Sequence, residues 1–350
     1  MLIRCELRKL CRAGFLPLLL LLAVGLRAVL CVIPSYHEHP YNDEVYKRCT
    51  GTLFGKLTEE KTACLNDRLT EIEELLAVYD EMQQRYTRGE ISLSEYSAYT
   101  SRHGIAAAEE STVRYLCRKC EALAACEGLD RQLFYDTPWQ ELFEDNGLDL
   151  LLLMGVICIA AVSFEREYSS GASAVLLTSG RGRGRLCAVK LCCAGATAIV
   201  LSLMLSGARL GVFAARTGLE FSDLPAGNVL ITGALGNKSL LGYFLTDAAL
   251  KALAAGMYAL LCCLMSVVSR GAVFAVSLSF IALLTPLLIL SGSEIPDAPY
   301  FLPAAVLRKM YPPETSPLLT ALLTAARGAL IFSAACILWS RRRASLRSVD

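Results

Sequence analysis

The sequence contains few of the side chains from which catalytic and metal sites are usually built. Histidine occurs 3 times in 350 residues, as His37, His39 and His103. None of the apolar segments holds a Ser-His-Asp set, a paired His-Glu zinc motif or two carboxylates. Cys117 and Cys120 form one Cys-x-x-Cys pair, but no second pair or nearby histidine completes it. We therefore expect no catalytic residue, no metal site and no enzyme activity in this chain.

A phosphate-binding loop and a basic surface are also missing. Residues 233–239 and 51–57 are rich in glycine and contain a lysine, but neither has the G-x-x-x-x-G-K-[ST] spacing. The net charge is +1, and residues 34–147 carry 12 Lys and Arg against 22 Asp and Glu. The run GRGRGR at 180–185 is too short for an RNA-binding tract. We predict no nucleic-acid partner and no cofactor bound directly by the chain.

Apolar residues are in excess, and they are concentrated in blocks. They make up 54% of the chain, against roughly 45–50% in soluble domains. A helix that crosses a membrane needs about 20 mostly apolar residues. Six segments fit this requirement: residues 14–33, 148–163, 186–208, 243–268, 271–290 and 318–339. The sequence therefore predicts an all-α, polytopic membrane protein with six transmembrane helices in contact with lipid.

The distribution of Lys and Arg predicts the orientation of these helices. Residues 1–13, 164–190, 270 and 341–350 carry 4, 5, 1 and 4 of them, which makes 14 on one side. The short loops of the opposite side carry 5. Since cytoplasmic loops are enriched in Lys and Arg, we expect both termini in the cytoplasm of a plasma-membrane protein. Residues 34–147 then lie outside.

The outer segment 34–147 has the pattern of a helical hairpin. Thr58 and the two acids after it suit a helix start, and Arg88-Gly89 suits its end. A second helix, about 93–127, begins at the capping box Ser92-x-x-Glu95. Apolar and aromatic residues recur at three- and four-residue spacing in both arms and predict the seam between them. They are Leu65, Leu69, Ile72, Leu76, Tyr79 and Tyr86 in the first arm, and Tyr96, Tyr99, Ala106, Val113, Cys117, Cys120 and Leu123 in the second.

Cysteines of this outer segment leave the disulfide pairing open. The candidates are Cys31, Cys49, Cys64, Cys117, Cys120 and Cys126. The role of the hairpin is open as well, because such an element can bind a ligand, pair with a copy of itself or hold the first two spans in register.

The segment 164–190, FEREYSSGASAVLLTSGRGRGRLCAVK, lies between the second and third spans. Glu165 and Glu167 favour the positive end of a short helix, while Gly171 allows a tight turn. The residues 175–177 give that helix one apolar patch. A helix of this kind can lie flat on the inner face of the membrane and press into a partner protein.

The same segment resembles the loop between the second and third spans in membrane subunits of type-2 ABC exporters. That loop follows the pattern F-x-x-E-x-x-x-G-T-x-x-x-L-L, then a turn, an arginine and a lysine. The matching residues are Phe164, Glu167, Gly171, Leu176, Leu177, Thr178, Arg183 and Lys190. Ala172 stands where threonine is usual, and Gly180 stands in place of a common proline. The subgroup with a large outer insertion between the first two spans fits the hairpin.

The resemblance implies a permease subunit of an exporter that moves its substrate with energy from a separate cytosolic ABC ATPase. The ATPase would bind ATP and Mg²⁺, and a second permease copy or a similar subunit would complete the transporter. Within the loop 164–185, the residues expected to contact the ATPase are Glu165, Glu167, Gly171, Val175, Leu176, Leu177, Arg181 and Arg183. Substrate and direction of transport do not follow from the sequence.

The apolar segments, together with the resemblance, divide the chain into parts. Residues 1–13 are similar to the family's amphipathic elbow helix, with apolar and basic residues on opposite faces. The first span, 14–33, precedes the outer domain, 34–147, and spans two to six occupy 148–340. A basic cytoplasmic tail, 341–350, completes the chain.

Charged residues inside the predicted spans are candidates for function, because charge in a bilayer costs at least a few kcal/mol. Asp247 and Lys251 are four residues apart and can neutralise one another. Arg327 lies deeper, in the sixth span, where it either bonds a neighbouring helix or lines a substrate route. The alternative to a permease is a membrane-anchored receptor or structural sensor, in which the hairpin binds a ligand or partner and no solute crosses.

Overall fold

The computed structural model describes residues 15–32, 39–144, 150–161, 163–164, 182–269, 272–292 and 316–341. These residues are mostly helical, with one small two-stranded sheet. They form two compact units. The first, called here the bundle, comprises Met1–Pro34, Phe143–Leu219 and Phe244–Asp350. The second, called the hairpin unit, comprises Ser35–Leu142 and Glu220–Tyr243.

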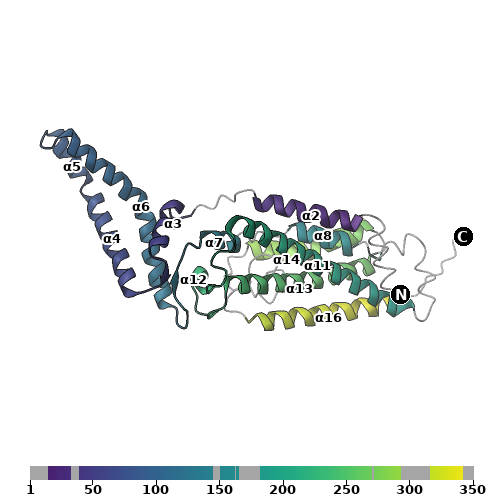
Figure 1. Ribbon diagram of the computed structural model, residues 1–350. Helices are drawn as coiled ribbons and strands as arrows, with labels where there is room; N and C mark the ends of the chain where they lie inside the picture. The colour runs from purple at the N-terminus through teal and green to yellow at the C-terminus, as the bar shows by residue number, and fades with distance from the viewer. Residues whose placement is uncertain are drawn as a thin grey trace. The chain divides into compact units, whose positions relative to one another are not determined.

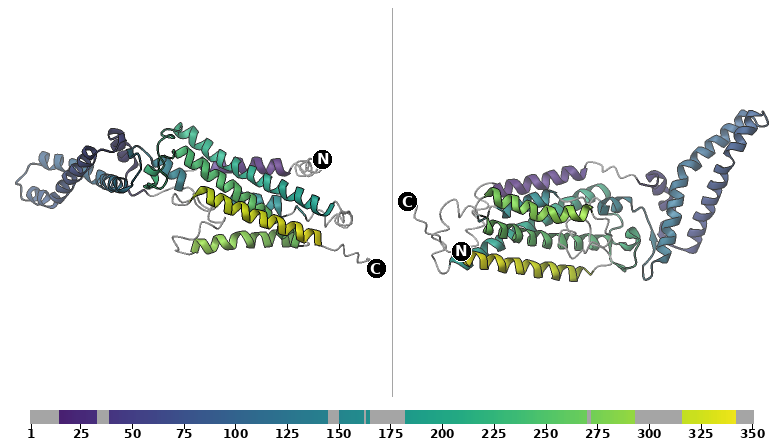
Figure 2. Two further views of the ribbon diagram at one scale, coloured as in Figure 1. Left: turned by 90° about the horizontal axis from the view of Figure 1, so that it is seen from below. Right: turned by 180° about the vertical axis from the view of Figure 1, so that it is seen from behind.

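Six apolar helices make up the described part of the bundle (Figure 1). They are α2 (Phe15–Val32), α8 (Leu150–Ala160), α11 (Gly182–Thr217), α13 (Leu240–Val268), α14 (Ala272–Gly292) and α16 (Pro317–Arg341). The central helix, α11, packs against α2, α8 and α16, and α8 also contacts α2 and α14. Figure 2 shows the bundle from two further sides, with α16 running alongside the other helices.

Three of these helices are long and apolar enough to cross a membrane: residues Gly184–Thr217, Leu240–Val268 and Pro317–Arg341. Shorter apolar stretches, Leu20–Val32, Leu151–Ala160 and Val273–Ala282, coincide with three other predicted spans. Large apolar side chains point outward from the bundle. Leu21 of α2, Val273 of α14 and Leu330 of α16 are each more than two-thirds exposed. Such an apolar surface is stable in lipid and costly in water, so the chain is a membrane-associated protein.

Small residues bring the long helices of the bundle close together. A Cβ atom on Gly195 of α11 would lie 3.8 Å from the carbonyl oxygen of Gly256 on α13. One on Gly256 would lie 3.0 Å from Ile199 Cγ1. On α16, a Cβ on Gly328 would meet Met257 of α13 at 3.8 Å. Close approach through small residues is the usual way in which membrane helices pack.

The hairpin unit is built around two antiparallel arms (Figure 1). Its helices are α3 (Asp43–Thr52), α4 (Glu59–Ala77), α5 (Tyr79–Thr87), α6 (Leu93–Ala125), α7 (Thr137–Glu144) and the short α12 (Gly227–Leu230). Its strands, β1 (Gly55–Lys56) and β2 (Gln132–Leu133), pair antiparallel. Thr58 caps α4 through Lys61 N, and Ser92 and Glu95 form the complete capping box of α6. The caps predicted from the sequence are confirmed.

The first arm is broken where the sequence predicts one helix. Val78 (φ −85°, ψ −1°) separates α4 from α5, and its backbone N–H bonds to Leu76 O. Val78 stays in the right-handed helical region, but its ψ of −1° is far from the ideal α-helical value of about −42°. A β-branched side chain has a low helix propensity, which favours the break at this residue. Both parts of the arm still pack against α6.

Residues 220–243, the connection between α11 and α13, fold into the base of the hairpin unit. Buried Asn228 accepts a hydrogen bond from Gln132 N (3.1 Å) and donates one to Asp130 O (3.1 Å). Trp139 Nε1 donates to Glu220 O at 2.9 Å. At Gly233 a Cβ would lie 2.5 Å from the carbonyl oxygen of residue 127, so only glycine fits there. The hairpin unit is therefore formed by two separate insertions in the chain.

Candidate functional site

Most residues of the predicted ATPase contact lie outside the described residues. Glu165, Glu167, Gly171, Val175, Leu176, Leu177 and Arg181 belong to this group. Arg183 lies in the first turn of α11, and its side chain is likewise not described. The structure does describe both ends of the segment 165–181. The chain enters it at Phe164, just after α8, and leaves it at the start of α11.

The entry to the segment is held by four buried residues and the partly buried Ser163. Together they are called here the loop-base cluster: Ser163, Phe164, Lys190, Ser266 and Trp339. Phe164 is fully buried, and its ring centroid lies 5.0 Å from that of Trp339, with an interplanar angle of 56°. The Phe164 backbone N–H donates to Ser266 Oγ at 3.4 Å. These contacts connect the end of α8 to α13 and to α16.

Lys190 joins the entry of the segment 165–181 to α11, the helix that follows the segment. It lies on α11 with 6% of its surface exposed. Its Nζ donates to the carbonyl oxygen of Ser163 at 2.8 Å and lies 5.5 Å from the centre of the Phe164 ring. An ammonium group is stabilised both by carbonyl groups at a helix C-terminus and by an aromatic face. One cation therefore joins the two ends of the segment 165–181.

Residue Cys263 gives a second connection between α8 and α13 at the same level. Its Sγ lies 3.4 Å from Ser163 Oγ and 3.7 Å from the carbonyl oxygen of Ala160, to which it donates. Thiol hydrogen bonds are weak, so their contribution is mainly to position the end of α8. The loop-base cluster is thus tied to four helices of the bundle.

The ion pair predicted between Asp247 and Lys251 is present. Lys251 Nζ lies 2.9 Å from Asp247 Oδ2 on α13, and their side chains are 14% and 4% exposed. Pairing at i, i+4 lowers the cost of both charges in an apolar environment. Because both residues lie on α13, the pair stabilises that helix locally.

Arg327 of α16 is partly buried. Its Nη1 atom is fully buried and has no hydrogen-bond partner among the described residues. The next residue, Gly328, packs against Leu260 and Met257 of α13. The two roles predicted for Arg327, a bond to a neighbouring helix and a place on a substrate route, both stay predictions.

A buried polar network lies at the base of the hairpin unit. Asp136 is fully buried and pairs with Lys119 of α6, whose side chain is 3% exposed. Tyr46 donates to Asp136 Oδ1 at 2.6 Å and accepts from Lys119 Nζ at 2.9 Å. Gln140 donates to Asp136 Oδ2 at 3.0 Å. Burial, and next the charge of Asp136, raise the pKa of Tyr46 above its ordinary value, so its hydroxyl remains a donor.

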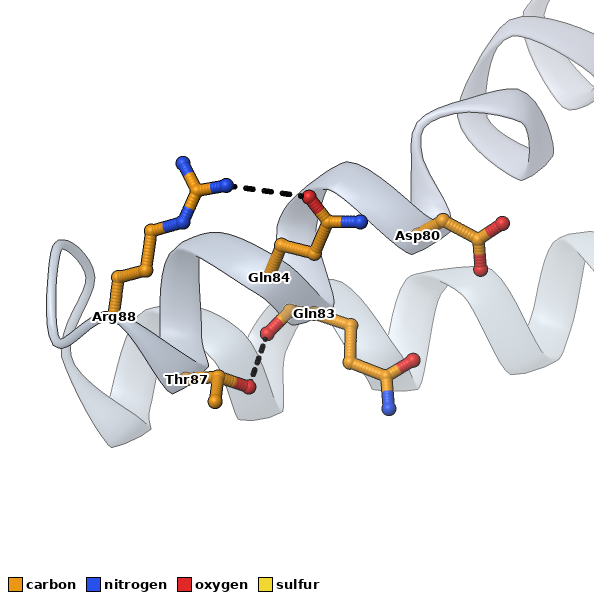
Figure 3. Close-up of a pocket in the computed structure, with 5 residues that line it drawn as sticks. All are labelled: Asp80, Gln83, Gln84, Thr87 and Arg88. Carbon is orange, nitrogen blue, oxygen red and sulfur yellow. Dashed lines mark hydrogen bonds between the residues drawn. The ribbon is translucent and has the colours of Figure 1, made fainter.

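A surface depression near the tip of the hairpin offers no comparable site (Figure 3). All five lining residues come from α5 and its C-terminal cap: Asp80, Gln83, Gln84, Thr87 and Arg88. The two hydrogen bonds drawn there join Arg88 to Gln84 (3.5 Å) and Thr87 to the carbonyl of Gln83 (2.9 Å). Both lie within one helix. Side chains of a single helix do not enclose a ligand, which usually needs walls from several elements.

The sequence did not reveal every residue of the loop-base cluster or of the buried polar network around Asp136. Trp339 and Ser266 stand outside the motif at 164–190, and no spacing rule connects them to Phe164. Lys119 and Asp136 each look like ordinary surface charges in the sequence. A signal was nevertheless present for Lys119, since it lies between Cys117 and Cys120 on the predicted seam of the second arm. Among the described residues, no group of three or more His, Cys, Asp or Glu side chains is placed to hold a metal ion.

Comparison of the chain with protein-family models, with curated proteins and with solved structures finds no match.

Proposed function

We propose that the chain is the permease subunit of an ATP-binding cassette exporter and works with a separate cytosolic ATPase. The observation that carries the proposal is the loop-base cluster. Phe164 and Lys190, the first and last residues of the family-like pattern, contact each other although 26 positions separate them. A segment that transmits force between a partner protein and the bundle must be anchored rigidly at its ends, because a mobile anchor would shift without moving the helices.

The rest of the bundle is consistent with this role. Three candidate membrane spans and three shorter apolar helices are compatible with the six spans that we expect of such a subunit. The hairpin unit would then lie outside the cytoplasm, and the 165–181 segment would lie inside it. A second copy of the chain, or a similar subunit, would complete the transporter in the plasma membrane, with both termini in the cytoplasm. Nucleotide and Mg²⁺ would be held by the ATPase.

Co-purification of the full-length protein with its ATPase tests the proposal. We expect the wild-type protein in detergent to carry an ATPase with a Walker A motif, identified by mass spectrometry. The complex should hydrolyse ATP in a vanadate-sensitive manner. The double variant Leu176→Asp/Leu177→Asp should lose at least nine-tenths of the bound ATPase, because two carboxylates cannot enter an apolar cleft without partners.

A matched control places the same charges elsewhere on the predicted cytoplasmic side. The double variant Leu346→Asp/Val349→Asp in the basic tail should keep the ATPase. Equal recovery in the two double variants would reject the 165–181 segment as the contact. A wild-type protein with no ATPase, together with specific binding of a ligand to the hairpin unit, would favour the receptor alternative.

A further inference from the structure

Under the proposed function, a push from the ATPase would enter the bundle at Phe164 and at the start of α11, and it would reach the helices by two different routes. α8 and α11 are joined to the segment through the backbone, so they follow it directly. α13 and α16 have no such connection to it. They pack against α11, and they also meet the entry of the segment through side-chain contacts of their own.

Those contacts are Ser266 on α13 and Trp339 on α16. Ser266 is 1% exposed and accepts the Phe164 backbone N–H, while the fully buried Trp339 ring packs against the Phe164 ring. Protein interiors are close-packed, and a buried aromatic pair has no free space into which one ring can move alone. Packed elements of this kind switch between discrete arrangements and do not deform continuously. A shift of Phe164 must therefore displace Trp339 or break the contact.

We infer that Trp339 and Ser266 are positioning residues that transmit the ATPase cycle from Phe164 to α16 and α13. This inference rests on the proposed function. It adds two residues that lie outside the family-like motif, and it identifies α16 as a moving helix. Lys190 has the complementary role: it keeps Ser163 and Phe164 in place, so that a push on the segment is delivered to Trp339.

The chain provides its own reporter, because it contains 2 tryptophans, Trp139 and Trp339. We suggest growing the full-length protein with 5-fluorotryptophan and combining it with the unlabelled ATPase recovered by co-purification. The fluorine NMR spectrum then reports only on the permease. A Trp139→Phe variant assigns the two resonances. Spectra are compared between the nucleotide-free complex and the complex trapped with ATP and vanadate.

The expected result is a Trp339 resonance that moves by more than its line width between the two nucleotide states. In a Phe164→Leu variant the ATPase should still co-purify at the wild-type level, but the nucleotide-dependent shift of Trp339 should disappear. The matched control is Phe274→Leu on α14, where the phenylalanine is 76% exposed and lies outside the cluster. This variant should keep the full shift.

The outcomes separate the inference from the proposed function. If no ATPase binds the wild-type protein, the proposed function fails. If the ATPase binds and the Trp339 resonance is the same in both nucleotide states, the transmission role is wrong and the proposed function stands. A full shift in Phe164→Leu would show that α16 is reached by another route. The wild-type comparison needs no substitution, so it holds even if the Phe164 variant does not fold.

Discussion

The buried pair Lys119–Asp136 gives the strongest prediction for the hairpin unit. A Lys119→Met substitution removes the cation and leaves a fully buried carboxylate with hydrogen bonds only from Tyr46 and Gln140. Removing one partner of a buried ion pair costs about 3–5 kcal/mol. Each 1.4 kcal/mol is a factor of about ten in an equilibrium constant. Opening of the hairpin unit should therefore become between about a hundred and a few thousand times more frequent.

Amide hydrogen exchange of the full-length protein measures this opening. The peptide that covers residues 112–123 of α6 is the one to follow, because most of its residues are buried. The matched control is Arg114→Met on the same helix. Arg114 also pairs with two acids, Glu110 at 2.7 Å and Glu73 at 3.1 Å, but its side chain is 43% exposed. An exposed pair contributes about 0–1 kcal/mol, so exchange in this control should rise less than about fivefold.

A double variant distinguishes loss of the pair from loss of packing. Asp136→Asn together with Lys119→Met removes both charges and keeps an acceptor for Tyr46. We expect the double variant to be more stable than the sum of the two single losses predicts, with an interaction energy of about 1–3 kcal/mol. Strict additivity, or a Lys119→Met effect no larger than that of Arg114→Met, would refute the view that charge pairing stabilises this base.

Three further predictions concern other parts of the hairpin unit. Gly233→Ala should destabilise the unit by about 1–3 kcal/mol, because its Cβ would clash with a backbone carbonyl. Gly104→Ala, in open space on α6, should stabilise the unit by about 0.5–1 kcal/mol. Hydrogen exchange of the two variants measures both effects. The capping hydrogen bonds from Ser92 lower the pKa of Glu95 in the folded state. The cap therefore contributes fully above the unfolded pKa and is lost as the pH falls through the folded pKa. Protection of residues 92–96 against exchange, relative to the intrinsic rate at each pH, should fall in acid, and this fall should be absent in Glu95→Gln. Burial raises the pKa of Cys120 to about 11. At pH 8, iodoacetamide should therefore label exposed Cys64 and leave Cys120 unmodified until the unit is unfolded. Mass spectrometry of the peptides measures the labelling of each cysteine.

The capped starts of the hairpin helices followed from the sequence because their causes are local. The capping box at Ser92 and Glu95 and the cap at Thr58 act over three residues, and both are present as predicted. The i, i+4 pair Asp247–Lys251 is local in the same sense. Apolar blocks of the required length predicted the membrane helices, since the bilayer imposes that length on any sequence. The six-span count and the orientation remain predictions.

Contacts between distant residues were decided by the tertiary structure alone. Trp339 meets Phe164 across 175 positions because α16 and the end of α8 reach the same point in the bundle. Residues 220–243 join the hairpin unit through Asn228 and the space left at Gly233, and no pattern within that stretch identifies its partner. The sequence alone determined the capped starts of the two hairpin arms and which segments are apolar enough to suit a membrane. The packing of the whole chain decides which distant helices come into contact. Shape complementarity between such helices leaves no fixed spacing in the sequence.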